Sequence, residues 1–208
     1  MGKKATHARY SLTVSNNKYV MLSDNKSEHI MMFAFYENEI HFTSRLKGNL
    51  HASSGMPSNY ILSLAGAPLV EEWHEKNIFH RVGKPARRHQ TQEGVLLSES
   101  WMIKGIYHCE TGPALIQYMH DGRPLKQQWV IKGGLHRTDG PASINYHYSD
   151  IFIPDGEEPL RVLKAVKKEW FINGKSVDRG DGICSEEVDE NDNVIKTTAV
   201  REGWSVSR

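Results

Sequence analysis

One repeated motif constrains the fold of this chain more strongly than any other feature of its sequence. Each copy begins with Trp and continues with Gly four residues later, His seven residues later, and Gly-Pro-Ala eleven to thirteen residues later. The copies that begin at Trp101 and Trp129 keep all of these positions, whereas the copy that begins at Trp73 keeps His80 and Pro85-Ala86. Agreement at so many fixed offsets predicts a protein built from repeats.

Two weaker copies flank these three. The five copies start at positions 44, 73, 101, 129 and 170, so successive starts lie 29, 28, 28 and 41 residues apart. Ser44 stands in the Trp position of the first copy, and the last copy loses the motif after Gly174. Such decay is expected because the end repeats of an array face solvent and diverge to cap it. The sequence therefore predicts an N-terminal β cap over residues 1–43, a hairpin-repeat array over 44–182, and an acidic C-terminal hairpin and tail over 183–208.

The residues inside each copy indicate β-hairpins. Gly105, Gly133 and Gly174 stand where a tight hairpin turn needs a positive φ angle. Between copies, the segments 114–118 and 142–146 alternate in the period of two that is typical of a half-buried strand. The predicted fold is therefore mainly β, with repeated antiparallel β-hairpins that form an extended twisted sheet.

The segments outside the regular copies have their own predicted structure. In the cap, residues 8–22 are predicted to form a hairpin and residues 30–42 a buried strand pair. Residues 147–167 are an insertion relative to the regular period, and the segment 160–168 is predicted to form a short helix. A final strand is predicted over 194–200.

Composition favours a folded, soluble protein. Hydrophobic residues make up 38% of the 208 residues and charged residues 25%. The 26 basic side chains are balanced by 25 acidic ones, which argues against general nucleic-acid binding and against an anionic membrane surface. The sequence has no recognisable signal peptide and no apolar stretch long enough to cross a membrane. Two distant cysteines fit a reducing compartment, so the cytoplasm is the expected location.

Four histidines recur at one position of successive copies, namely His51, His80, His108 and His136. Equivalent residues two strands apart in a sheet are separated by about 10 Å, whereas one zinc ion needs donors at ~2.1 Å. We therefore expect these imidazoles to bond backbone groups of the turns. Neither a metal nor a cofactor is expected. No catalytic residue is assigned, because nucleophile elbows, Walker loops and dinucleotide fingerprints are absent from the sequence.

Two departures from the repeat are candidate partner-binding segments, since binding residues concentrate on loops that a rigid scaffold carries. The first is the basic run 80–89, where the strand alternation breaks and an exposed excursion is expected. Its candidate residues are Arg81, Lys84, Arg87 and Arg88. An acidic protein or a phosphate group is the candidate ligand, nucleic acid is a less favoured alternative, and a solvated or turn-capping guanidinium is the alternative for Arg81.

The second candidate segment is the insertion, where Ile151, Phe152 and Ile153 are three consecutive apolar residues. If exposed, they would form an apolar anchor of the kind found at interface centres. The alternative is that they pack onto the sheet of this chain.

The stretch Trp129-x-x-x-Gly133-x-x-His136 resembles the MORN class of β-hairpin repeats, which places Gly and His at the same distances after Trp. The full set of Trp, Gly, His-Arg and Gly-Pro-Ala is more similar to a MORN-like variant found in bacteriophages, giant viruses and bacteria. The resemblance covers residues 44–182, with a period of 28 that is longer than the MORN period and without a Tyr-x-Gly lead-in before Trp. It implies a scaffold that binds proteins or sometimes lipids and has no chemistry of its own.

Three functional hypotheses follow. The first is a non-enzymatic protein-binding repeat scaffold, in the form of a phage-encoded host-takeover or anti-defence inhibitor that binds a host macromolecule in the host cytoplasm. The second is a structural virion component, such as a decoration or tail-associated protein. The third is a metal-dependent nuclease or hydrolase with dispersed His and Asp residues. The identity of the partner and the oligomeric state stay open.

Overall fold

β-strands connected by turns make up the described part of this protein. The computed structural model describes residues 10–15, 18–24, 26–52, 55–151 and 160–199. The chain separates into two compact units, Met1–Ile106 and Tyr107–Arg208. Strands pair antiparallel within both units, and the described residues include no helix of the length and apolarity that crossing a membrane requires. The prediction of a mainly β protein built from repeated antiparallel hairpins is confirmed.

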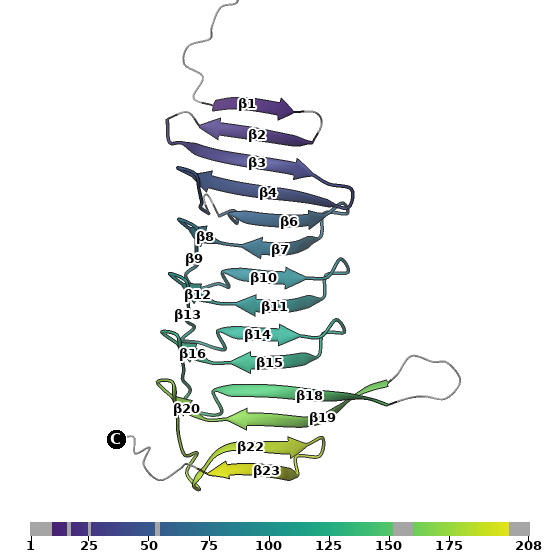
Figure 1. Ribbon diagram of the computed structural model, residues 1–208, viewed down its shortest axis with the longest axis vertical. Helices are drawn as coiled ribbons and strands as arrows, with labels where there is room; N and C mark the ends of the chain where they lie inside the picture. Colours follow the sequence, from purple (N-terminus) through teal and green to yellow (C-terminus); the bar gives the residue numbers. More distant parts are fainter. Residues whose placement is uncertain (1–9, 16–17, 25, 53–54, 152–159, 200–208) are drawn as a thin grey trace, which may run out of the picture. The chain divides into compact units, whose positions relative to one another are not determined.

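Unit 1 is a ladder of strands in chain order, with short hairpins beside it (Figure 1). Its strands are β1 (Tyr10–Ser15), β2 (Tyr19–Asp24), β3 (His29–Phe35), β4 (Glu39–Leu46), β5 (Asn49–Leu50), β6 (Asn59–Ser63), β7 (Pro68–Glu72), β8 (His74–Glu75), β9 (Ile78–Phe79), β10 (Arg87–Gln90), β11 (Leu96–Ser100) and β12 (Met102–Ile103). The order in the sheet is β1-β2-β3-β4-β6-β7-β10-β11, while β5 pairs with β4 and β8 pairs with β9. The short strand β13 (Ile106–Tyr107) lies at the division between the units.

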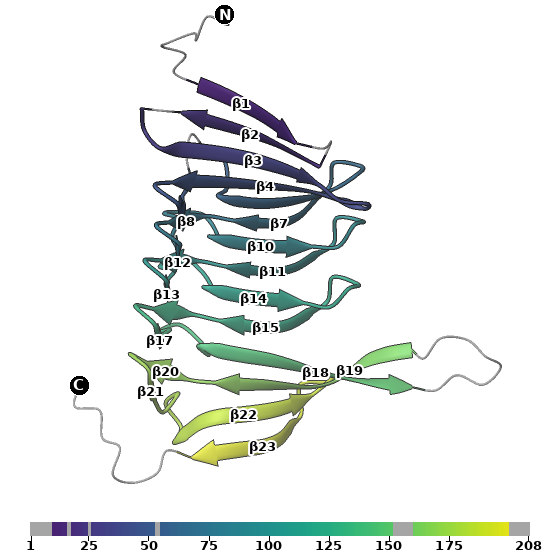
Figure 2. The same ribbon diagram turned by 45° about the horizontal axis from the view of Figure 1, so that its top comes forward.

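Unit 2 repeats this design with one longer hairpin (Figure 2). Its strands are β14 (Leu115–Tyr118), β15 (Pro124–Gln128), β16 (Val130–Ile131), β17 (Gly134–Leu135), β18 (Ser143–Ile151), β19 (Leu160–Glu169), β20 (Phe171–Ile172), β21 (Lys175–Ser176), β22 (Ile183–Asp189) and β23 (Val194–Ala199). The order in the sheet is β14-β15-β18-β19-β22-β23, while β16 pairs with β17 and β20 pairs with β21.

The short hairpins turn through two residues that both have positive φ angles. These pairs are Lys47-Gly48, Lys76-Asn77, Lys104-Gly105, Lys132-Gly133 and Asn173-Gly174. Positive φ at both central residues is the geometry of a type I′ turn, whose twist matches that of the flanking strands. The predicted role of the glycines is therefore confirmed, and Asn77 takes the same part because Asn tolerates the left-handed region.

Three of the four repeated histidines connect neighbouring copies by hydrogen bonds to the next hairpin turn. The Nδ1 atoms of His80, His108 and His136 accept hydrogen bonds from the backbone N–H groups of Lys104, Lys132 and Asn173, at 3.1, 3.2 and 3.2 Å. The expected bond from imidazole to turn backbone is confirmed for these copies. In the first copy, the Nδ1 atom of His51 is buried and has no partner among the described residues.

Each of three tryptophans is covered by an arginine of its own copy. The guanidinium carbons of Arg81, Arg137 and Arg179 lie 3.4, 4.0 and 5.3 Å from the ring centroids of Trp73, Trp129 and Trp170, respectively. Of the repeated tryptophans only Trp73 is fully buried, and Trp101, Trp129 and Trp170 are half-buried. The alanines of the Gly-Pro-Ala position, Ala86, Ala114 and Ala142, have no exposed surface at all.

Several sequence predictions need correction. The predicted helix at 160–168 is wrong, because Leu160–Glu169 is strand β19, paired with β18 on one side and β22 on the other. The strand pair at 30–42 is present, but it is not a buried pair, since Phe33 and Phe35 are exposed. The final strand is present as β23 through Ala199, and residue 200 lies outside the described residues.

Candidate functional site

The register of unit 1 aligns one side chain from each of seven strands on the same face of the sheet, because directly paired residues share a face. We call this set the central row: Val20, Phe33, Phe42, Tyr60, Glu71, Arg88 and Glu99. One end of the row is apolar, with the rings of Phe33 and Phe42 4.9 Å apart. The other end is ionic. A single face of the sheet therefore changes from apolar to charged along the row.

The ionic end of the central row lines a concavity with a volume of about 420 Å³. Its wall contains the apolar residues Met56, Pro57 and Pro85, the aromatic residues Tyr60 and Trp73, and the charged residues Glu71, Arg81, Lys84, Arg88 and Glu99. Three cations against two carboxylates leave the wall with a surplus of positive charge. The arrangement suits a ligand with an apolar part and an anionic group.

Arg88 is held in place by two carboxylates of the central row. Its Nε lies 2.8 Å from Glu99 Oε1, and its Nη1 lies 3.2 Å from Glu71 Oε2. The two Glu side chains are mostly buried, with 16% of each exposed, whereas 34% of Arg88 is exposed. The main role of Arg88 is therefore to balance the charge of two neighbouring carboxylates. Only the exposed part of its guanidinium is available to a ligand.

Arg81 is fixed by stacking on Trp73 and by a hydrogen bond from its Nη1 to the carbonyl oxygen of Pro85 at 3.1 Å. Burial lowers the pKa of Arg81, although the nearby Glu71 carboxylate acts in the opposite direction. The guanidinium nevertheless stays charged at neutral pH. The turn-capping role that was the alternative for Arg81 is therefore present, and the same group also lines the concavity.

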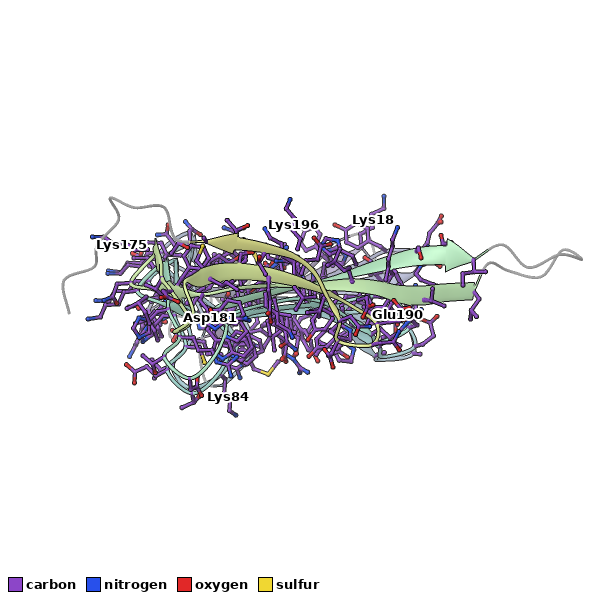
Figure 3. The ribbon with its side chains drawn as sticks, turned by 90° about the horizontal axis from the view of Figure 1, so that it is seen from below. Lys18, Lys84, Lys175, Asp181, Glu190 and Lys196 are labelled. Carbon is purple, nitrogen blue, oxygen red and sulfur yellow. The ribbon has the colours of Figure 1, made fainter. Side chains whose placement is uncertain are left out.

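Lys84 is the open cation of the concavity. It lies in the turn between β9 and β10 and is exposed, and it forms no ion pair with a described residue. Figure 3 shows Lys84 projecting outward from unit 1, on the side opposite to Lys18. A lysine ammonium is a mobile point charge, so it can reach an anion that enters the concavity.

The remaining residues predicted for the basic segment behave differently. Arg87 lies on the opposite face of the sheet from Arg88, beside Glu72 at 3.2 Å. The expected excursion from the sheet is wrong for residues 87–90, which form strand β10 between β7 and β11. The structure thus brings Arg81, Lys84 and Arg88 together and separates Arg87 from them.

Only one residue of the second predicted segment can be placed. Ile151 is the last residue of β18 in unit 2, pairs with Leu160 and is exposed. Phe152 and Ile153 lie outside the described residues.

Sequence reasoning missed Tyr60, Glu71, Glu99 and Met56 as parts of the site. Tyr60 lies beside Glu71, and burial raises the pKa of its phenol, with the carboxylate acting in the same direction. The phenol therefore stays protonated and can donate a hydrogen bond. None of these residues stands out in the sequence, because only the strand register places them next to Arg88.

A serine–histidine contact elsewhere in unit 1 is sealed from solvent. Ser58 Oγ lies 2.8 Å from His74 Nδ1, and Ser58 has 0% of its surface exposed. The same hydroxyl donates to the carbonyl oxygen of Glu72 and accepts from the backbone N–H of His74. A substrate cannot reach this hydroxyl, so the contact is structural. Across the described segments, no group of three His, Cys, Asp or Glu side chains could hold a metal ion.

His74 makes stability depend on pH. Burial lowers the pKa of His74 and the cation of Arg87 lowers it further, while Glu72 opposes them. The neutral imidazole is thus favoured in the folded state, whereas an unfolded His titrates near about 6.5. The contribution of His74 to the free energy of unfolding is therefore fully present above that pH, and it is lost as the pH decreases below it. Melting temperatures at pH 7.5 and 5.5 should show a larger acid loss for the wild type than for His74→Gln. An equal loss in both proteins would contradict this assignment.

Comparison with known proteins gave no match among protein-family models, curated proteins or solved structures.

Proposed function

We propose that this protein is a non-enzymatic repeat scaffold that binds a partner protein, and that the concavity of unit 1 receives an acidic segment of that partner. The observation that carries the proposal is the wall of the concavity, where fixed cations and the open cation of Lys84 stand beside apolar and aromatic side chains. Such a mixture of apolar anchors and arginine is typical of the centres of protein interfaces.

The apolar end of the central row extends this surface. Phe33 is 39% exposed, and Phe35, two residues further along β3 on the same face, is 46% exposed. No described element of unit 1 packs over β3 as a second layer (Figures 1 and 2). Contiguous exposed apolar surface on a soluble protein commonly marks an interaction site. A partner segment that places an acidic residue at Lys84 and apolar residues along β3 and β4 would complement both the ionic end and the apolar end of the central row.

The concavity is less suited to catalysis than to binding. Arg88 is paired with two carboxylates and Arg81 is stacked on Trp73, and both guanidinium groups stay protonated at neutral pH, so neither can act as a general acid or base. A phage-encoded inhibitor of a host protein is the specific form of the proposal that the resemblance to MORN-like repeats favours.

Charge reversal at Lys84 tests the proposal. Immobilised wild-type protein and the variants Lys84→Glu and Lys18→Glu would be incubated with a bacterial lysate, and bound proteins would be quantified by mass spectrometry. Lys18→Glu is the matched control, because it reverses an exposed lysine on the other side of the same unit (Figure 3). We expect at least one protein whose recovery falls about tenfold with Lys84→Glu and is unchanged with Lys18→Glu.

Equal recovery of every bound protein by the two variants would contradict the proposed site. The variant Arg87→Gln addresses the opposite face of the sheet. A loss of binding confined to Arg87→Gln would move the interface to that face and would likewise overturn the proposal.

A further inference from the structure

Successive hairpin turns of unit 1 present a regular row of lysines. Lys47, Lys76 and Lys104 each occupy the first central position of a two-residue turn, with φ angles of 50°, 53° and 51°. Asn, Asp and Gly are the residues that tolerate this left-handed position best, and lysine gains nothing from it conformationally. The fourth turn, in unit 2, also has lysine at this position, with a φ angle of 50° at Lys132. A reason other than turn geometry is needed for the charge.

Hydrogen bonds between the turns hold this row in place. The backbone N–H of Leu50 donates to Asn77 Oδ1 at 2.6 Å, and Asn77 Nδ2 donates to Asn49 Oδ1 at 2.6 Å. The next turn is held by a backbone hydrogen bond, which the N–H of Gly105 donates to the carbonyl oxygen of Phe79 at 2.8 Å. The three lysines are therefore carried on a fixed support. None of them forms an ion pair with a described residue, and all three are exposed.

Exposed isoleucines alternate with the lysines. Ile78 and Ile106 follow the second and third turns, and each has 50% of its surface exposed. Gly105 belongs to the same packing, because a Cβ at this residue would lie 3.0 Å from Ile78 Cγ2. We call the set of Lys47, Lys76, Ile78, Lys104 and Ile106 the Lys/Ile stripe. A surface that alternates cations with apolar groups favours a protein ligand, because a phosphate backbone would cover the isoleucines without an apolar partner.

The spacing of the stripe matches one kind of protein segment. One copy contributes two strands to the sheet, so successive lysines are about 10 Å apart. An α-helix rises ~10.5 Å over seven residues and about 5 Å over three or four. Acidic residues at every seventh position, with apolar residues between them, would therefore face the lysines and isoleucines in turn.

We propose that the Lys/Ile stripe is a second interaction surface, separate from the concavity, which binds an amphipathic acidic helix of a partner protein. The helix lies along the row of turns with its acidic residues against Lys47, Lys76 and Lys104. Its apolar residues cover Ile78 and Ile106. Glu75 pairs with Ile78 across the β8–β9 hairpin and is exposed, so it is an acidic neighbour that weakens the attraction.

The test uses a fluorescent synthetic peptide about three heptads long, with Glu at every seventh position and Leu at the third and fourth positions between them. Its binding to the full chain would be measured by fluorescence anisotropy, beside a scrambled peptide of the same composition. We expect the regular peptide to bind more tightly than the scrambled one, and to bind less tightly as salt rises from about 0.05 to 0.3 M.

Asparagine substitutions separate charge from folding. In the triple variant Lys47→Asn, Lys76→Asn and Lys104→Asn, each turn keeps a residue that suits positive φ, so we expect an unchanged or higher melting temperature. Binding should fall by about tenfold or more, as three cation–carboxylate contacts are lost. The control variant Lys18→Asn, Lys164→Asn and Lys196→Asn removes the same charge from exposed positions outside the stripe and should bind normally. Glu75→Gln should bind more tightly than the wild type.

Three results would overturn the proposal. One is equal affinity for the regular and the scrambled peptide. Another is unchanged binding by the triple asparagine variant. The third is a single-stranded oligonucleotide that binds the stripe more tightly than the peptide, which would assign the surface to nucleic acid. Lys84→Glu should leave peptide binding unchanged, so failure of the concavity and failure of the stripe are distinguishable.

Discussion

Replacement of Trp73 with alanine is expected to lower the free energy of unfolding by about 3–5 kcal/mol, the usual cost of truncating a buried tryptophan. Only 7% of Trp73 is exposed, and its ring supports the guanidinium of Arg81 at 3.4 Å. The truncation therefore removes buried apolar surface and the support of a fixed cation at once. Urea unfolding followed by circular dichroism would measure the change.

Trp129→Ala is the matched comparison, because Trp129 holds the same position of the repeat but is only half-buried, with Arg137 at 4.0 Å. We expect a smaller loss of stability from this variant than from Trp73→Ala. A Trp129→Ala variant that kept its stability and lost partner binding would reassign the tryptophans as a binding stripe. A Trp73→Ala variant with wild-type stability would contradict the role of Trp73 in the core.

Replacement of Arg88 with alanine is expected to cost about 1–3 kcal/mol, because it leaves Glu71 and Glu99 without their shared cation. The full cost of breaking a buried ion pair is larger, but Arg88 is a third exposed, so water offsets part of the loss. The two carboxylates then repel each other, and this repulsion is screened by salt. The deficit measured by urea unfolding should therefore shrink when NaCl is raised to about 0.5 M.

Arg87→Ala is the control for this prediction. Arg87 pairs with Glu72 on the opposite face and is 44% exposed, so we expect its removal to cost less than about 1 kcal/mol. Equal losses from Arg87→Ala and Arg88→Ala, or a deficit in Arg88→Ala that does not respond to salt, would show that Arg88 does not hold the two carboxylates.

Much of the fold was accessible from the sequence because the interactions that define it are local. A two-residue turn requires residues that accept positive φ, and Gly105, Gly133 and Gly174 mark three of these turns directly. His80 and His108 each bond the turn of the next copy, 24 residues along the chain. A fixed offset between repeats is enough to predict such contacts, so no knowledge of distant packing was needed.

The candidate site was only partly accessible, because strand register decides it. The basic run in the sequence predicts partner binding by Arg87 and Arg88 alike. Adjacent residues of a strand nevertheless point to opposite faces of the sheet. Pairing with β7 and β11 places Arg88 between Glu71 and Glu99, and Tyr60 joins them through β6. These partners are separated from Arg88 by 11 to 28 residues, and no pattern in their local sequence predicts the contact.

Segment 160–169 shows the same limit in secondary structure. Its apolar residues recur at spacings that fit a helix as well as a strand, so the local pattern does not distinguish the two structures. In the structure, Leu160–Glu169 pairs with Ser143–Ile151 along one edge, and its second half, residues 165–169, also pairs with β22 along the other. Backbone groups that are bonded on both edges of a strand gain more than an isolated short helix, which is marginal in water. Tertiary pairing, rather than local preference, made this segment a strand.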